Sequence, residues 1–137
     1  MSAKVFFDTN VLVYAADKAN PKKQERARAV LRDAVDAGIG VLSTQVLQEF
    51  YVVATKKLAM DPIVAKELIL GFENMEIVQV TPSLIRNAVD TSVVNRLSFW
   101  DSLIVVSAEA GACDTLLTED LNQGQTIRGV RVQSPFV

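Results

Sequence analysis

Short apolar runs alternate along the chain with longer segments in which apolar side chains recur every three or four residues. The short runs are typical of buried strands, and the longer segments are typical of amphipathic helices. We therefore predict strands at residues 4–7, 39–42, 76–80, 115–117 and 130–133. We predict helices at residues 11–16, 21–38, 44–58, 62–74, 82–95 and 99–111, and a polar surface turn at residues 122–129.

Capping residues support several of the predicted helix starts. A polar residue precedes a proline at Asn20, Asp61 and Thr81, which places the proline at the first helical position. Ser43 or Thr44 is expected to cap the third helix. Strands that alternate with helices predict a parallel sheet with helices on both faces. In such sheets ligands bind beyond the carboxyl ends of the strands, so we expect the chemistry there.

The composition indicates one folded domain without a global attraction to polyanions. The chain has 137 residues, of which 50% are hydrophobic, and its formal net charge is −2 at pH 7. This length fits a single domain, residues 1–137, with a substantial core. Because the net charge is slightly negative, any site for a polyanion must be built from local positive charge.

Two residue types restrict the chemistry and the compartment. The chain has no histidine, which excludes histidine-dependent catalytic triads and histidine-ligated metal sites. Its single cysteine, Cys113, excludes an internal disulfide and is interpreted as a small core residue. No segment has the pattern of a signal peptide or approaches the ~20 apolar residues of a membrane span, so we expect a cytoplasmic protein.

Two aspartates follow predicted strands and are expected at the same edge of the sheet. Asp8 comes directly after the strand at residues 4–7, and Asp120 follows the strand at residues 115–117 closely. Taken alone, Asp8 is equally compatible with a turn or a helix cap. Glu119 is an alternative to Asp120, and we expect one of these two side chains to point to solvent.

Two further acids lie on predicted helices close to apolar faces. At 100° per residue, Glu49 lies about 40° outside the arc of Val46, Phe50 and Val53. Asp101 lies inside the arc of the apolar residues that follow it, and also in the first helical turn, where the helix dipole favours negative charge. The alternatives are a solvated glutamate at the edge of the face and an aspartate that serves the helix dipole alone.

A cluster of these four carboxylates predicts a divalent cation. Carboxylates that come together without counter-ions repel one another and raise their own pKa values. A divalent cation removes this repulsion and can also activate water for attack on a phosphodiester. Because the candidate ligands are all oxygen atoms, we expect Mg²⁺ or Mn²⁺ rather than zinc.

Four sequence motifs resemble those of the PIN-domain ribonucleases and, more narrowly, the VapC-type toxins of bacterial toxin–antitoxin pairs. The motifs are FFDTNVLVYA, QVLQEFY, FWDSLIVVSA and LLTEDLNQG, which occur in this order over nearly the whole chain. The resemblance implies a three-layer α/β/α sandwich with a parallel, Rossmann-like sheet. It implies that the metal ligands are Asp8, Glu49, Asp101 and Asp120.

The same resemblance implies a reaction, partners and two supporting residues. The expected reaction is hydrolysis of single-stranded RNA by water that Mg²⁺ or Mn²⁺ activates. The expected partners are the RNA substrate, a small cognate antitoxin and a second copy of the chain in a homodimer, without a membrane. Asn10 and Thr118 are expected to support Asp8 and Asp120, with helix capping and turn formation as their alternative roles.

Positive charge gathers on the helix predicted at residues 21–38, but the sequence does not select the residues that contact RNA. Most of these side chains are interpreted as a solvated face, and a few near the acidic site as candidates for binding the RNA backbone. The basic residues of this helix are Lys22, Lys23, Arg26, Arg28 and Arg32; further basic residues are Lys56 and Lys57 at the end of the next helix, and Arg86 and Arg96 around another. Phe99 and Trp100 are interpreted as core or dimer contacts rather than base-stacking residues.

Two other functions are compatible with part of the pattern. A catalytically silent PIN-like module would bind RNA or protein without cleavage, but a cluster of negative charge adds nothing to RNA binding. A haloacid-dehalogenase-type phosphatase would use Asp8 as a nucleophile, but it requires a second aspartate at the position of Asn10. Metal-dependent RNA cleavage and trapping of an acyl-phosphate separate the three functions.

Overall fold

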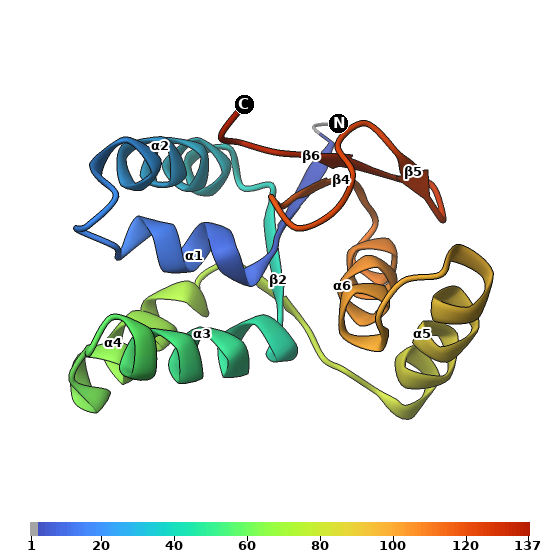
Figure 1. Cartoon of the computed structure of the whole chain (residues 1–137), viewed down its shortest axis with the longest axis horizontal. Coiled ribbons are helices and arrows are strands. Elements are labelled where there is room, and N and C mark those ends of the chain that lie inside the picture. Colours follow the sequence, from blue (N-terminus) through green and yellow to red (C-terminus); the bar gives the residue numbers. More distant parts are fainter. Residues whose placement is uncertain (1–2) are drawn as a thin grey trace.

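A computed structural model describes residues 3–137 and shows a sheet flanked by helices (Figure 1). The strands are β1 (Lys4–Phe7), β2 (Gly40–Ser43), β3 (Glu76–Val78), β4 (Cys113–Leu117), β5 (Thr126–Ile127) and β6 (Val130–Gln133). The helices are α1 (Thr9–Ala15), α2 (Pro21–Ala37), α3 (Thr44–Lys57), α4 (Pro62–Phe72), α5 (Pro82–Asn95) and α6 (Phe99–Ala110). None of the helices in this range combines the length and apolar character that a membrane span requires.

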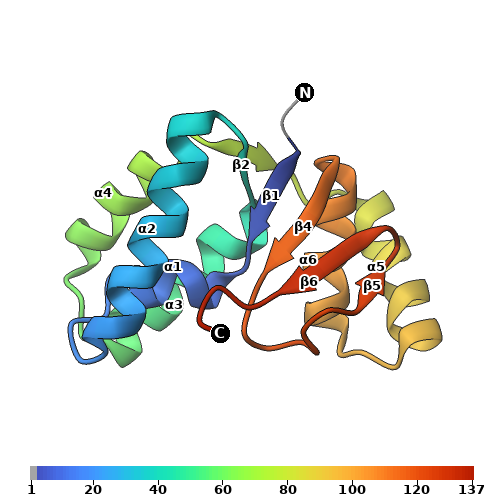
Figure 2. The same ribbon diagram turned by 90° about the horizontal axis from the view of Figure 1, so that it is seen from above.

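The six strands form one sheet in the order β3-β2-β1-β4-β6-β5. β1 pairs in parallel with β2 and β4, and β5 is antiparallel to β6. Helices α1 to α4 lie on one side of the sheet, and α5 and α6 lie on the other (Figures 1 and 2). The predicted α/β/α fold is therefore confirmed. Because the chain runs from β1 outward to β3 and then returns to β4, the strand order reverses at β1.

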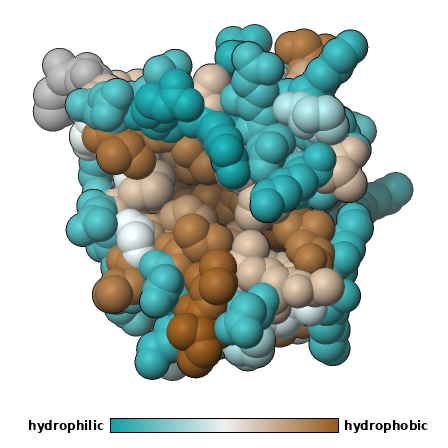
Figure 3. Space-filling view, turned by 90° about the vertical axis from the view of Figure 1, so that its left-hand side faces the viewer, coloured by the Kyte–Doolittle hydropathy of each residue, from teal (hydrophilic) through white to brown (hydrophobic). Residues whose placement is uncertain are grey.

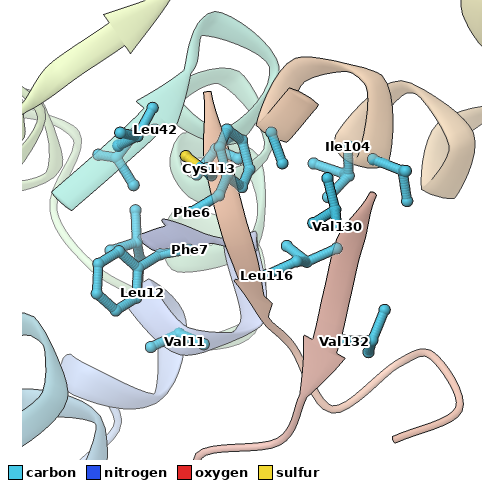
Figure 4. Close-up of a cluster of buried hydrophobic side chains, with 14 of the residues drawn as sticks. Phe6, Phe7, Val11, Leu12, Leu42, Ile104, Cys113, Leu116, Val130 and Val132 are labelled. Carbon is cyan, nitrogen blue, oxygen red and sulfur yellow. The ribbon is translucent and has the colours of Figure 1, made fainter. Parts of the chain in front are cut away.

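Buried apolar side chains hold both layers of helices to the sheet. Phe6 and Phe7 of β1 and Leu116 of β4 are completely buried in the larger of two clusters (Figure 4). Full burial of a side chain of this size stabilises the fold by roughly 1.5–3 kcal/mol. Cys113 belongs to the same cluster, as predicted, and its burial raises the pKa of the thiol to about 12. A smaller cluster around Leu103 packs α5 against α6.

The start of α3 shows the expected capping chemistry, whereas the start of α2 does not. The Ser43 hydroxyl oxygen accepts a hydrogen bond from the backbone N–H of Val46, so the cap of α3 is Ser43 rather than Thr44. Asn20 makes no capping bond from its side chain, and its amide donates to Asp17 instead. Asn20 is nevertheless the N-cap residue, as predicted, because its backbone carbonyl accepts from the N–H of Gln24 at 2.8 Å and Pro21 takes the first helical position.

The pattern missed one strand and misplaced the ends of others. Residues 122–129, predicted as a turn, contain β5, which is held by pairing with β6 and by burial of Ile127. α1 begins at Thr9, two residues before its predicted start, because the Asp8 carboxylate caps it. β3 is two residues shorter than predicted, since the N–H of Val80 donates to the Thr44 hydroxyl rather than to a neighbouring strand.

Candidate active site

A cavity of about 670 Å³ lies beyond the carboxyl ends of β1 and β4, and all four predicted carboxylates line it. Asp8 follows β1, Glu49 lies on α3, Asp101 lies in the first turn of α6, and Asp120 follows β4. These segments are distant in sequence but converge where the strand order reverses, which is where open α/β sheets form ligand-binding crevices.

Asp8 is the buried member of this set. It is 5% exposed, and its carboxylate accepts hydrogen bonds from the backbone N–H of Thr9 (2.7 Å) and from the Thr118 hydroxyl (2.7 Å). The Asn10 amide adds a longer contact of 3.4 Å. All three donors are uncharged, so they orient the carboxylate without neutralising it.

The pKa of Asp8 reflects the lack of a neutralising positive charge around it. Burial raises it from 3.8 to about 7, although the hydrogen bonds from Thr118 and Thr9 act in the opposite direction. The negative charges of Asp120 and Glu49 contribute to this increase. These two carboxylates therefore act on Asp8 through space, as expected for a shared site.

Thr118 and Asn10 connect Asp8 to Asp120. The buried Thr118 hydroxyl donates to Asp8 and accepts hydrogen bonds from the Asn10 amide (3.0 Å) and the backbone N–H of Asp120 (3.1 Å). The same amide donates to Asp120 Oδ2 at 3.1 Å. The residue that caps α1 is Asp8, so the alternative capping role of Asn10 is wrong.

Glu49 is held by two residues that sequence reasoning missed. The Thr9 hydroxyl donates to Glu49 Oε1 at 2.7 Å, and the Gln45 amide lies 3.4 Å from Oε2. Gln45 is 4% exposed and also donates to the carbonyl of Trp100 at 3.2 Å, which ties α3 to the start of α6. Two sequence features could have identified them: Gln45 lies one helical turn before Glu49, and Thr9 directly follows Asp8.

Asp101 lines the cavity but stands apart from this network. Its backbone N–H donates to Ser98, the cap of α6, at 3.0 Å. Within residues 3–137, its carboxylate has neither a hydrogen bond nor a salt bridge. Of the aromatic residues before it, Phe99 packs against the smaller core cluster, whereas Trp100 is 61% exposed and borders the cavity. The core interpretation of Trp100 is therefore wrong.

Glu119 and Lys23 form part of the rim. Glu119 accepts a hydrogen bond from the Tyr14 hydroxyl (2.7 Å) and pairs with Lys23 (2.9 Å). Burial disfavours its charge, but these two hydrogen bonds outweigh that effect and lower the pKa of Glu119. We expected Glu119 or Asp120 to face solvent; both residues are exposed, and both also line the cavity. They differ instead in their partners, because Glu119 is paired with a cation.

The donor set suits a hard divalent cation. All four predicted acids offer oxygen atoms, and none takes part in a salt bridge found within residues 3–137. In the same part of the chain, no three ligand side chains already form a compact metal-binding cluster. A cation would supply the positive charge that the network around Asp8 lacks.

A match to a protein-family model assigns the chain to a family. Residues 5–127 match the model of the PIN domain. The chain belongs to the PIN-domain family. The family predicted from the four sequence motifs is thus confirmed. No curated protein gave a significant match.

Solved structures share this PIN-domain fold at low sequence identity. VapC20 of Mycobacterium tuberculosis, described as a sarcin-ricin loop cleaving toxin, is 16% identical with a TM-score of 0.70, over 82% of this chain and 87% of that one. A toxin–antitoxin complex from Klebsiella pneumoniae is 18% identical with a TM-score of 0.70, over 96% and 98%. DNA-bound VapBC from Salmonella typhimurium is 18% identical with a TM-score of 0.67, over 98% and 99%.

Proposed function

We propose that this PIN-domain protein is a metal-dependent endoribonuclease that cleaves single-stranded RNA. Its active-site residues are Asp8, Glu49, Asp101 and Asp120. The observation that carries the proposal is their convergence on one cavity around a buried Asp8, with no salt-bridge partner for any of them within residues 3–137. The family and the fold shared with a sarcin-ricin loop cleaving toxin support the ribonuclease class.

The four carboxylates would hold Mg²⁺ or Mn²⁺, and their neighbours would orient them. A bound divalent cation lowers the pKa of its water and offsets charge on the scissile phosphate. Beside it, ionised Asp8 becomes favourable despite its burial. Thr118 and Asn10 hold the oxygens of Asp8 and Asp120, and Thr9 holds Glu49, so these ligands are oriented before substrate arrives.

The proposed biological role is that of the toxin in a toxin–antitoxin pair, acting in the cytoplasm as a homodimer. Two structural neighbours, a toxin–antitoxin complex and VapBC, support a small antitoxin as partner. Apolar side chains gather beside a hollow on the side that carries α1 to α4 (Figure 3), which leaves surface for protein contacts. A solution mass twice the 15.0 kDa of the chain is the test of the dimer.

The test of the nuclease is cleavage of a labelled single-stranded RNA in EDTA and after addition of Mn²⁺. Asp8→Asn removes the charge of the buried ligand and keeps its shape. Asp33→Asn is the matched control, because Asp33 is an exposed aspartate on α2 outside the cavity. We expect Mn²⁺-dependent cleavage by the wild type and the control, and a loss of about 100-fold or more in Asp8→Asn.

Each other outcome of this test rejects part of the proposal. Equal cleavage in EDTA and Mn²⁺ would remove the metal from the mechanism. RNA binding without cleavage by all three proteins would indicate a silent binding module. Hydrolysis of a small phosphate ester through a trapped acyl-phosphate on Asp8 would favour the phosphatase.

A further inference from the structure

A second pocket of about 260 Å³ lies between α2 and the C-terminal segment, and every charged side chain of residues 3–137 that lines it is basic. Its basic residues are Lys22, Lys23 and Arg26. Arg26 Nε donates to the carbonyl of Pro135 at 2.8 Å, which fixes the guanidinium against the C-terminal segment. Its remaining N–H groups make no hydrogen bond within the described chain, so they are available to an anion.

This basic pocket adjoins the acidic cavity. Lys23 lines the basic pocket and Glu119 lines the acidic cavity, and the two side chains form a salt bridge of 2.9 Å. Tyr14 of the acidic cavity packs edge-on against Phe136 of the basic pocket, with ring centroids 5.0 Å apart. One ion pair and one aromatic pair therefore separate the two pockets, and a strand of nucleic acid can span both.

We propose that the basic pocket binds a backbone phosphate of the RNA strand whose scissile phosphate lies in the acidic cavity, an inference that rests on the proposed function. Four carboxylates repel a phosphodiester chain, and a divalent cation compensates for this at the scissile phosphate alone. The adjoining part of the strand needs positive charge from the protein, and a net charge of −2 supplies none at long range.

The structure selects the residues that the sequence leaves open. Lys22 and Arg26 are exposed and have no carboxylate partner within residues 3–137. Lys23 is already paired with Glu119, so its charge is partly neutralised. Lys22 and Arg26 are therefore the phosphate-binding residues. Arg26 contributes most, because a guanidinium presents paired N–H donors that match two phosphate oxygens.

The experiment measures RNA binding separately from cleavage. Fluorescence anisotropy follows a labelled single-stranded RNA added to Asp8→Asn protein in EDTA, over a series of salt concentrations. Arg26→Gln is expected to weaken binding about fivefold and to reduce the slope of log affinity against log salt by about 0.7, the value for one lost phosphate contact on a single strand. In otherwise wild-type protein, the same substitution is expected to raise KM more than it lowers kcat.

Arg32→Gln is the matched control, because Arg32 is an exposed arginine of the same helix outside both pockets. Equal weakening by Arg32→Gln and Arg26→Gln would overturn the site, while cleavage by the wild type would leave the proposed function intact. Lys22→Gln guards against a folding effect, since Lys22 makes no hydrogen bond within residues 3–137. Unchanged affinity and salt slope in both Lys22→Gln and Arg26→Gln would equally overturn the site.

Discussion

The two pockets have opposite charge and are built in opposite ways. The acidic cavity sits at the ends of β1 and β4, and its central carboxylate, Asp8, is buried among uncharged donors. The basic pocket consists of long side chains from the surface of α2 beside the C-terminal segment. Because a buried carboxylate is costly to ionise and an exposed ammonium group is not, the acidic cavity lowers the stability of the metal-free fold. The basic pocket costs the fold little.

The largest expected effect concerns the stability of the metal-free protein. Burial raises the pKa of Asp8 from 3.8 to about 7, so the unfolded chain releases this proton at a lower pH than the folded chain. The stability that protonated Asp8 contributes is complete below about pH 4 and is lost as the pH rises through about 7. We expect Asp8 to lower the free energy of unfolding by up to about 4 kcal/mol over that window in EDTA.

The measurement is urea unfolding in EDTA at several pH values, compared between the wild type and Asp8→Asn. Asparagine is also a good helix cap, so α1 keeps its start. As the pH rises, the free energy of unfolding of Asp8→Asn should increase relative to that of the wild type. Added Mn²⁺ should stabilise the wild type and not the variant. If the free energy of unfolding of the two proteins changed with pH in the same way, Asp8 would not be the cause of the pH-dependent loss of stability.

Much of the fold follows from local signals, and the exceptions have a physical cause. The helix at residues 82–95 and the strand at residues 130–133 form as predicted. Thr81 and the following proline mark the start of that helix. β5 has two residues, too few for any periodicity, and its hydrogen bonds come from β6. A strand defined by its partner cannot be recognised from its own residues.

The candidate site also has features that the local sequence predicts and features that it does not. The positions of Asp8 and Asp120 at strand ends are local features, and the parallel-sheet rule brings those ends together. The contacts that hold the acids are not local, since Thr9 reaches Glu49 across 40 positions and Thr118 reaches Asp8 across 110. Such contacts depend on the relative placement of whole elements, which no short motif encodes.

A smaller effect is expected when the support of Asp8 is removed and its charge is kept. Thr118→Val has the same shape, but it leaves the buried carboxylate without its 2.7 Å hydroxyl donor. We expect Mn²⁺ affinity to fall about 10- to 100-fold, as is typical for residues that orient metal ligands. Quenching of Trp100 reports binding, because it is the chain's single tryptophan and borders the cavity.

Thr55→Val is the control for this substitution. The Thr55 hydroxyl donates to carbonyls of its own helix, at Tyr51 and Val52, and makes no contact with the four acids. Its Mn²⁺ affinity should equal that of the wild type. If Thr118→Val also retained full affinity, the hydrogen bond to Asp8 would be part of the fold without being part of the metal site.

The smallest expected effect lies at the boundary between the pockets. The Lys23–Glu119 salt bridge is 2.9 Å long, but its side chains are 40% and 28% exposed, so water screens it. Lys23→Met keeps the length of the side chain and removes the charge, which lies 4.5 Å from the centre of the Tyr14 ring. A double-mutant cycle with Glu119→Gln should give a coupling of about 0.2–1 kcal/mol in urea unfolding near neutral pH. Because the pKa of Glu119 is lowered, this coupling should vanish as acid protonates the carboxylate. A coupling above about 2 kcal/mol would mean that the salt bridge contributes substantially to the stability of the fold. The two pockets would then be energetically coupled rather than independent.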